Sequence, residues 1–296
     1  MMVVTVGVGV IMRSIVAFQR NTCRWLPTTK VSSIPLAFVR CASRSAMRLQ
    51  SNNIVEQSVV KVDWKTQWDE IVKMRHDLPA PIDSMGAEAL AERNRPDDKT
   101  FRFQTLIGTM LSPQTKDAQT SQAFDNLVAF VAPEPLTPSS LSKYSVTDIE
   151  KCINMVSFYT RKAECIVEAA IKCKEEFNDD IPKDFDTLLS FRGVGPKVGY
   201  LTFTIAWGET LGICVDTHVH RISNRLDWVS TWNSKSNGPE KTRKALEKVL
   251  PRDKWEDVNF LLVGFGQSIC SAVKPKCEQC GLQSHCKYYL DPTHMR

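Results

Sequence analysis

The stretch "LLSFRGVGPKVGY", residues Leu188–Tyr200, places two glycines, a proline and a lysine in five consecutive positions between two apolar segments. Gly193 and Gly195 predict a tight reversal, because glycine adopts positive φ at little steric cost. Pro196 suits the first turn of a new helix, where its missing N–H is not needed. The stretch therefore predicts a helix-hairpin-helix. Its free amides favour a bound anion such as a nucleic-acid phosphate, although an ordinary helix-helix turn is an alternative.

Apolar residues recur at helical spacing along most of the chain beyond this hairpin. Strand-like alternation is scarce, so we expect an all-α fold. A polar linker is expected at Arg93–Thr100, before the main helical block. Helices are predicted at residues 64–76, 101–111, 117–130, 146–155, 161–177, 183–190, 196–207 and 240–250.

Lys197 lies one residue into the helix that follows the hairpin. The amino-terminal end of a helix carries a partial positive charge, so a cation is disfavoured there. This position favours a neutral amine, which is a nucleophile able to form a Schiff base with a sugar carbon. The alternative is a surface lysine that lies over the hairpin.

In the segment "CVDTHVHRISNR", Asp216 lies nineteen residues downstream of Lys197. Asp216 is placed to cap a helix over residues 217–226, and capping alone would explain it. A carboxylate at the edge of a cleft could instead steady positive charge on a sugar and help to activate an amine. His218 and His220 point to different faces of such a helix, so we interpret them as packing residues rather than a metal site.

Four cysteines near the carboxyl terminus follow the pattern C-x6-C-x2-C-x5-C, at Cys270, Cys277, Cys280 and Cys286. Such a cluster indicates a metal site or disulfides, and an intracellular address would favour metal. A zinc ribbon normally uses two C-x2-C pairs, whereas only one is present here. An iron-sulfur cluster, of the 4Fe-4S type, is therefore the preferred interpretation over zinc. Lys274 and Lys276 lie on the first loop of this site and would form a local cationic patch suited to phosphates.

Residues 1–55 contain seven basic residues and no acidic one, while the rest of the chain carries 31 basic and 33 acidic residues. The net charge of the chain beyond the leader therefore does not indicate DNA binding, and any nucleic-acid site must be a local patch of basic residues. The leader has the composition of a mitochondrial transit peptide; a disordered tail is the alternative, and Met47 could serve as a second start. Arg13 interrupts the apolar opening well short of a membrane span, so no transmembrane helix is expected.

Together, the hairpin stretch, "VDTHVHRISNR" and the cysteine tail resemble the endonuclease III family of DNA glycosylases and lyases, most closely its eukaryotic members. The resemblance covers roughly residues 60–290. It implies two helical domains, one at 100–210 with the hairpin and one formed by 56–99 and 211–296 with the cluster, and an active site in the cleft between them. It also implies a monomer that acts on duplex DNA with damaged bases or abasic sites, in the nucleus and the mitochondrion.

The resemblance also implies roles for particular residues. Lys197 matches the nucleophile that forms the Schiff base, and Asp216 matches the catalytic carboxylate. Gln114 in "LSPQTKD" matches the polar residue that fills the gap left by a flipped base; an ordinary loop glutamine is the alternative. Gly193 and Gly195 match the amides that hold phosphate, sometimes with a monovalent cation at the hairpin. The reaction implied is excision of an oxidised pyrimidine followed by β-elimination.

The sequence departs from the family pattern around the hairpin. Arg192 replaces the usual proline and would add a cation beside the phosphate site. Gly199 replaces the more usual alanine, and Tyr200 replaces a small polar or imidazole side chain and could alter the pocket. Other functions to weigh are an adenine-mismatch glycosylase, which lacks a nucleophilic lysine, an oxidised-guanine glycosylase, which lacks the cysteine tail, and a non-catalytic DNA-binding module.

Overall fold

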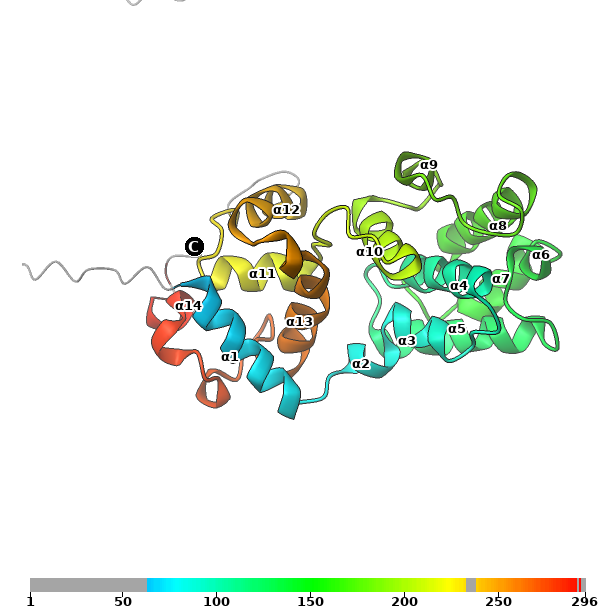
Figure 1. The fold of residues 1–296 in the computed structure, drawn as a ribbon. Helices are drawn as coiled ribbons and strands as arrows, with labels where there is room; N and C mark the ends of the chain where they lie inside the picture. The colour runs from blue at the N-terminus through cyan, green and yellow to red at the C-terminus, as the bar shows by residue number, and fades with distance from the viewer. Residues whose placement is uncertain (1–62, 233–237, 292, 294–296) are drawn as a thin grey trace, which may run out of the picture. The chain divides into compact units, whose positions relative to one another are not determined.

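A computed structural model of the chain describes residues 63–232, 238–291 and 293, and every regular element in these ranges is a helix (Figure 1). The leader at 1–55 and Met47 lie outside the described residues. None of the described helices is both long and apolar enough to cross a lipid bilayer. The α-helices are α1 Trp64–Asp77, α2 Pro81–Met85, α3 Ala87–Glu92, α4 Asp98–Leu111, α5 Asp117–Val131, α6 Pro138–Leu141, α7 Val146–Ile153, α8 Tyr159–Glu176, α9 Phe185–Leu189, α10 Pro196–Trp207, α11 Thr217–Arg225, α12 Gly238–Val249, α13 Trp255–Ser268 and α14 Lys287–Leu290; 3₁₀ turns lie at Arg252–Lys254, Cys277–Gln279 and Gln283–His285.

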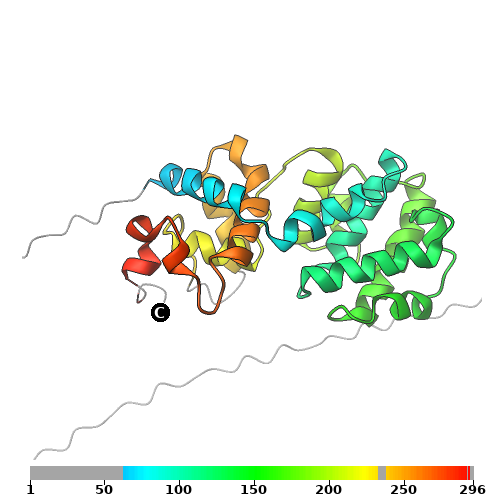
Figure 2. The same ribbon diagram turned by 90° about the horizontal axis from the view of Figure 1, so that it is seen from below.

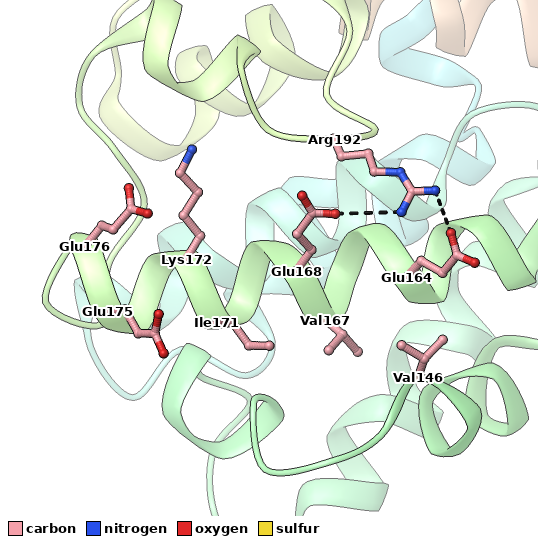
Figure 3. Close-up of a pocket in the computed structure, with 9 residues that line it drawn as sticks. All are labelled: Val146, Glu164, Val167, Glu168, Ile171, Lys172, Glu175, Glu176 and Arg192. Carbon is pink, nitrogen blue, oxygen red and sulfur yellow. Dashed lines mark hydrogen bonds and ion pairs between the residues drawn. The ribbon is translucent and has the colours of Figure 1, made fainter. Parts of the chain in front are cut away.

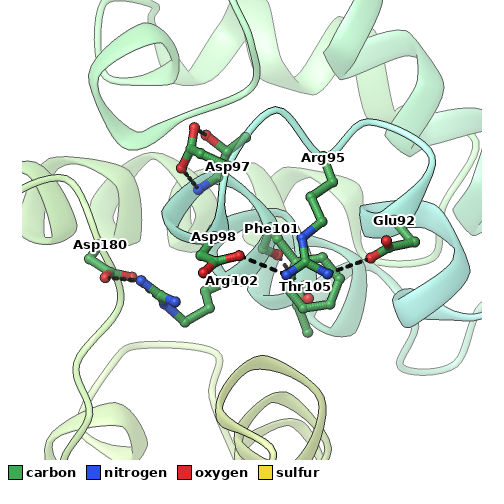
Figure 4. Close-up of polar contacts among 9 residues, drawn as sticks. Glu92, Arg95, Asp97, Asp98, Phe101, Arg102, Thr105 and Asp180 are labelled. Atoms are coloured by element: carbon green, nitrogen blue, oxygen red, sulfur yellow. Dashed lines mark hydrogen bonds and ion pairs between the residues drawn. The ribbon is translucent and has the colours of Figure 1, made fainter.

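The all-α prediction and all eight predicted helices are confirmed, with small differences at their ends. The linker predicted at Arg93–Thr100 is wrong at its carboxyl end, because α4 already begins at Asp98. The Asp97 side chain caps this helix by accepting a hydrogen bond from the amide of Thr100 at 2.9 Å. That bond lowers the pKa of Asp97. Figure 4 shows the cap beside the ion pair of Arg102 with Asp180, which ties α4 to the segment after α8.

Helices α2, α3, α6, α13 and α14 were not among the predicted segments. All of these except α13 have only four to six residues, too few to show a clear period. Helix α13 is long but lacks an evident polar face, because it packs against α1, α2 and α11 and buries eight of its residues. A helix that is covered on several sides loses the one-sided apolar pattern that identifies a surface helix.

The first hydrophobic core is built by α3 to α10 and holds the hairpin (Figure 2). Phe103, Leu106 and Ile107 of α4 are fully buried at its centre. Helix α10 packs along α4, and the hydroxyls of Thr109 and Thr202 are hydrogen-bonded across the interface at 2.6 Å. Leu90 of α3 is also fully buried in this core, so the segment just before residue 100 packs with the hairpin-bearing core.

The second core joins α1, α11, α12 and α13 to the carboxyl-terminal tail. Trp68 of α1 lies beside Trp228, with ring centroids 6.2 Å apart. Gln67 is completely buried and donates to the carbonyl oxygens of Leu226 and His285, so α1 is held against both the end of α11 and the tail. The chain passes between the cores after α10 ends, and Asp216 is the N-cap residue just before α11 of the second core.

Candidate active site

The hairpin forms at the predicted residues. Gly193 has a φ of +84°, and a Cβ there would stand 3.0 Å from Cys165, so both backbone conformation and space require glycine. Gly195 caps α10, and a Cβ at this position would meet nothing within 4 Å. Its backbone therefore faces open space at the amino-terminal end of α10, as an approaching phosphate would require.

The Lys197 side chain reaches from the first turn of α10 to the carboxyl-terminal end of α4. Its amine donates a hydrogen bond to the hydroxyl of Ser112 at 2.8 Å, and that hydroxyl donates in turn to the carbonyl oxygen of Thr109 at 3.1 Å. Lys197 is partly buried, and no ion pair of its amine is found among the described residues. A neutral partner leaves the amine free of a fixed carboxylate, which suits a nucleophile.

Asp216 caps α11 as predicted, because its Oδ1 accepts a hydrogen bond from the amide of Val219 at 2.8 Å. Buried residues on either side, Val215 and Val219, fix the start of the helix in the second core. Asn259 of α13 donates to the carbonyl oxygen of Cys214 at 3.2 Å and so fixes the segment that leads into Asp216. Capping uses one carboxylate oxygen, and the side chain remains at the wall of a cleft.

This cleft has a volume of about 890 Å³ and brings together Lys197, Asp216 and Gln114. Its walls come from α2, the loop between α4 and α5, the start of α5, α10, α11 and α13, so helices that pack into each of the two cores line it. Gly193, Gly195, the four cysteines, Lys274 and Lys276 do not line it. The arrangement places an amine and a carboxylate in one space that is large enough for a nucleotide base and sugar.

Gln114 is exposed and adopts a left-handed backbone conformation, with φ of 56°. Three residues that the sequence analysis did not single out hold or flank its loop. The Ser157 hydroxyl donates to the carbonyl oxygen of Gln114 at 2.7 Å, and Lys162 of α8 donates to the loop backbone. Phe158 follows Ser157 with a φ of 57° and is 66 % exposed. A positive φ is uncommon for a bulky residue, and residues with such a backbone conformation gather at functional sites. The combination of positive φ and exposure at this aromatic residue therefore indicates a functional position.

The two histidines of "THVH" have the packing roles that were predicted. His218 contacts Arg221 at 3.1 Å, and His220 contacts the Thr242 hydroxyl at 2.7 Å and stacks on Trp232. Burial lowers the pKa of both imidazoles. His218 also lines the cleft, which the sequence analysis did not predict.

Arg192 does not supply a free cation beside the hairpin. Its guanidinium pairs with Glu164 at 2.6 Å and with Glu168 at 3.8 Å on α8, in the separate surface pocket of Figure 3. The pocket is lined by several carboxylates and would repel a phosphate. The expected gain in cationic charge at the phosphate site is therefore offset by the neighbouring acids.

Tyr200 does not line the cleft, so the expectation that it alters the pocket is wrong. Its ring packs on Phe185 of the first core, with centroids 4.8 Å apart, and the Arg243 guanidinium of α12 lies 5.1 Å above it. Gly199 is explained by the same packing, since a Cβ there would lie 2.6 Å from Leu189.

The cysteine tail folds against the second core through Leu282, which is fully buried. Cys270, Cys277, Cys280 and Cys286 are all partly buried and carry no disulfide. Burial raises the pKa of Cys280 to about 11, and the negative charges of the other three thiolates add to this effect. If all four cysteines were deprotonated, their negative charges would repel one another unless a positively charged group were bound among them.

The donor set of this tail fits an iron-sulfur cluster. Arg225 donates to the Cys270 sulfur at 3.4 Å and to the carbonyl oxygens of Ser271 and Ala272 at 2.7 and 3.0 Å, which fixes the loop between the first two cysteines. Across residues 63–232, 238–291 and 293, no group of three or more His, Cys, Asp or Glu side chains is arranged to hold a metal ion. Lys274 and Lys276 on this loop are exposed.

Two family profiles match the chain. One, described as HhH-GPD superfamily base excision DNA repair protein, covers residues 107–252. The other, described as the iron-sulfur binding domain of endonuclease III, covers residues 270–286, the span of the four cysteines. The iron-sulfur cluster predicted from the cysteine spacing is thereby confirmed.

Curated relatives and solved structures agree with these profiles. Endonuclease III homolog 1, chloroplastic, of Arabidopsis thaliana is 40 % identical over 82 % of this chain and 65 % of its own length. Endonuclease III-like protein 1 of Gallus gallus is 40 % identical over 76 % of this chain and 77 % of its own length. The chain thus spans slightly less than two thirds of the Arabidopsis relative. A trapped endonuclease III-DNA covalent intermediate superposes with a TM-score of 0.64 and 26 % identity, covering 80 % of this chain and all of that one.

Proposed function

Because the chain belongs to the endonuclease III family of base excision DNA repair proteins, we propose that it is a bifunctional DNA glycosylase and abasic-site lyase acting on oxidised pyrimidines in duplex DNA. The observation that carries this proposal is the common cleft of Lys197 and Asp216. An adenine-mismatch glycosylase would need no nucleophilic lysine here, and a purely DNA-binding module would need neither residue.

The proposed reaction assigns one step to each group. The neutral Lys197 amine attacks C1′ of the flipped nucleotide, and the glycosidic bond breaks as the base leaves with the bonding electrons. The amine loses its proton and the sugar ring opens, which gives a Schiff base. Removal of a C2′ proton then expels the 3′ phosphate by β-elimination. Asp216 steadies the positive charge that develops on the sugar and assists these proton transfers.

The surroundings of the cleft supply the contacts to DNA in this proposal. The exposed backbone of Gly193 and Gly195 receives a phosphate, with a monovalent cation bound at the hairpin, and exposed Lys274 and Lys276 add a second, sequence-independent phosphate contact. Gln114 fills the gap left by the flipped base. Exposed Phe158, whose neighbour Ser157 is bonded to Gln114, is placed to insert between bases on the same side.

Cleavage of defined duplexes tests the proposed activity. We expect the purified protein to release an oxidised pyrimidine, cut the strand, and form a covalent complex when borohydride is present during the reaction. A duplex with adenine opposite guanine serves as the control and should remain intact. Excision of the mismatched adenine without trapping would support the adenine-mismatch function, and binding without cleavage of either duplex would support the non-catalytic module.

Cys270, Cys277, Cys280 and Cys286 hold the iron-sulfur cluster, whose role here is to neutralise four thiolates and fix the tail on the second core. We expect the purified protein to be brown and to contain iron with acid-labile sulfide. Cys277→Ser should lose iron and DNA binding together, while Cys152→Ser, a partly buried cysteine remote from the tail, should keep both. Stoichiometric zinc in a colourless protein would contradict this expectation.

We also propose that the protein acts as a monomer and is directed to the mitochondrion and the nucleus. The acid-free, arginine-rich leader at residues 1–55 supports an organellar address, and two relatives in Arabidopsis thaliana are named chloroplastic.

A further inference from the structure

Lys162 of α8 is a half-buried lysine whose three N–H groups are all used. Its amine donates to the carbonyl oxygen of Leu111 at 2.6 Å, to that of Pro113 at 2.9 Å and to the hydroxyl of Thr115 at 3.1 Å. No carboxylate pairs with this amine among the described residues. A lysine placed in this way costs desolvation energy, so its three bonds to one short loop call for an explanation.

Two of the three acceptors of Lys162 are carbonyl oxygens at the carboxyl-terminal end of α4 and just beyond it, those of Leu111 and Pro113. Helix ends leave carbonyl oxygens without intrahelical partners, and the partial negative charge there favours a cation. Burial, together with the charge of Lys197, nevertheless lowers the pKa of Lys162 to about 8. Two lysines therefore approach the same helix end, and only Lys162 bonds to its carbonyl oxygens, while Lys197 bonds to the Ser112 hydroxyl.

The Lys162 contacts continue to Gln114 through Thr115 and Ser157. The Thr115 hydroxyl accepts both from Lys162 and from the amide of Ser157 at 3.2 Å. The Ser157 hydroxyl donates to the carbonyl oxygen of Gln114 at 2.7 Å. Residues 111–115 are thus tied to the start of α8 on both sides of Gln114, which holds the strained φ of 56° at that residue.

We propose that Lys162 is a positioning residue for base excision, which fixes the 111–115 loop so that Gln114 can enter the DNA stack and Ser112 can orient the Lys197 amine. This inference rests on the proposed function. It assigns Lys162 no contact with DNA and no covalent step, because all its donors are directed at the loop. Without Lys162, Gln114 should lose the conformation on which its insertion depends.

A double-mutant cycle between Lys162→Met and Gln114→Ala tests the proposal, with single-turnover excision of an oxidised pyrimidine as the readout. Methionine keeps the length and packing of the stem but removes the three donors. We expect each single variant to lower the excision rate at saturating enzyme by about 10-fold or more, and the double variant to be little slower than the slower single one. Lys174→Met, the same change at an exposed position of α8, should stay within about 2-fold of wild type.

Two results would overturn the inference. In one, the double variant would be slowed by the product of the two single-variant factors, which would mean that the two residues act independently. In the other, the Lys162→Met protein would excise the base at the wild-type rate per folded molecule. Thr115→Val provides a second variant with nearly the same shape, should Lys162→Met fail to fold. It removes one acceptor of Lys162 and should slow excision in the same direction and couple to Gln114→Ala. Wild-type protein that does not excise the base at all would instead contradict the proposed function itself.

Discussion

The Lys197→Gln variant is expected to bind damaged duplex DNA with near wild-type affinity, yet to release no base, cut no strand and form no borohydride-trapped complex. Glutamine preserves the hairpin and can still donate a hydrogen bond to Ser112, so only the nucleophilic amine is lost. Because the Schiff base requires that amine, the expected loss of strand cleavage is complete within detection. Gel resolution of the covalent complex, alongside a binding titration on the same duplex, measures both properties.

Gly195→Asp is the matched control, with the opposite expected result. Space is open around Gly195, and aspartate is a favourable residue at the start of a helix, so the variant should fold. Its negative charge would stand where a phosphate must approach and should weaken binding to damaged and intact duplexes alike. If Lys197→Gln were trapped as efficiently as wild type, the nucleophile would be a different amine.

Asp216→Asn is expected to lower the rate of base release by about 10²- to 10⁴-fold while leaving DNA affinity near that of wild type. The asparagine oxygen can still accept from the amide of Val219, and asparagine caps helices as well as aspartate does. The substitution therefore removes the negative charge without removing the cap. Single-turnover excision and thermal unfolding of the same preparations separate the two roles.

Asp216→Ala completes this comparison, because it removes both cap and charge. It should lose about 1 kcal/mol of stability in addition to the activity lost by Asp216→Asn. An Asp216→Asn protein with full activity would show that capping is the only role of this carboxylate.

The sequence by itself determined the helical fold, the hairpin and the cysteine site, because each depends on local signals. Positive φ at Gly193, the proline that follows and the capping carboxylate of Asp216 act within a few residues of their positions. The spacing of the four cysteines likewise indicates a cluster without knowledge of the rest of the chain. Helix α13 was missed because burial on several sides leaves it without an amphipathic period.

Only the tertiary structure decided which side chains meet, because those contacts join residues far apart in the chain. Arg192 looks like a free cation in the sequence, but α8 places two glutamates against it; Tyr200 looks like a pocket residue, but it packs between Phe185 and Arg243. The partly buried bonds of Lys162 to the loop of Gln114 join residues about 50 positions apart and leave no local pattern. Periodicity and capping report on neighbours along the chain, whereas the walls of the cleft are set by how α2, α10, α11 and α13 pack.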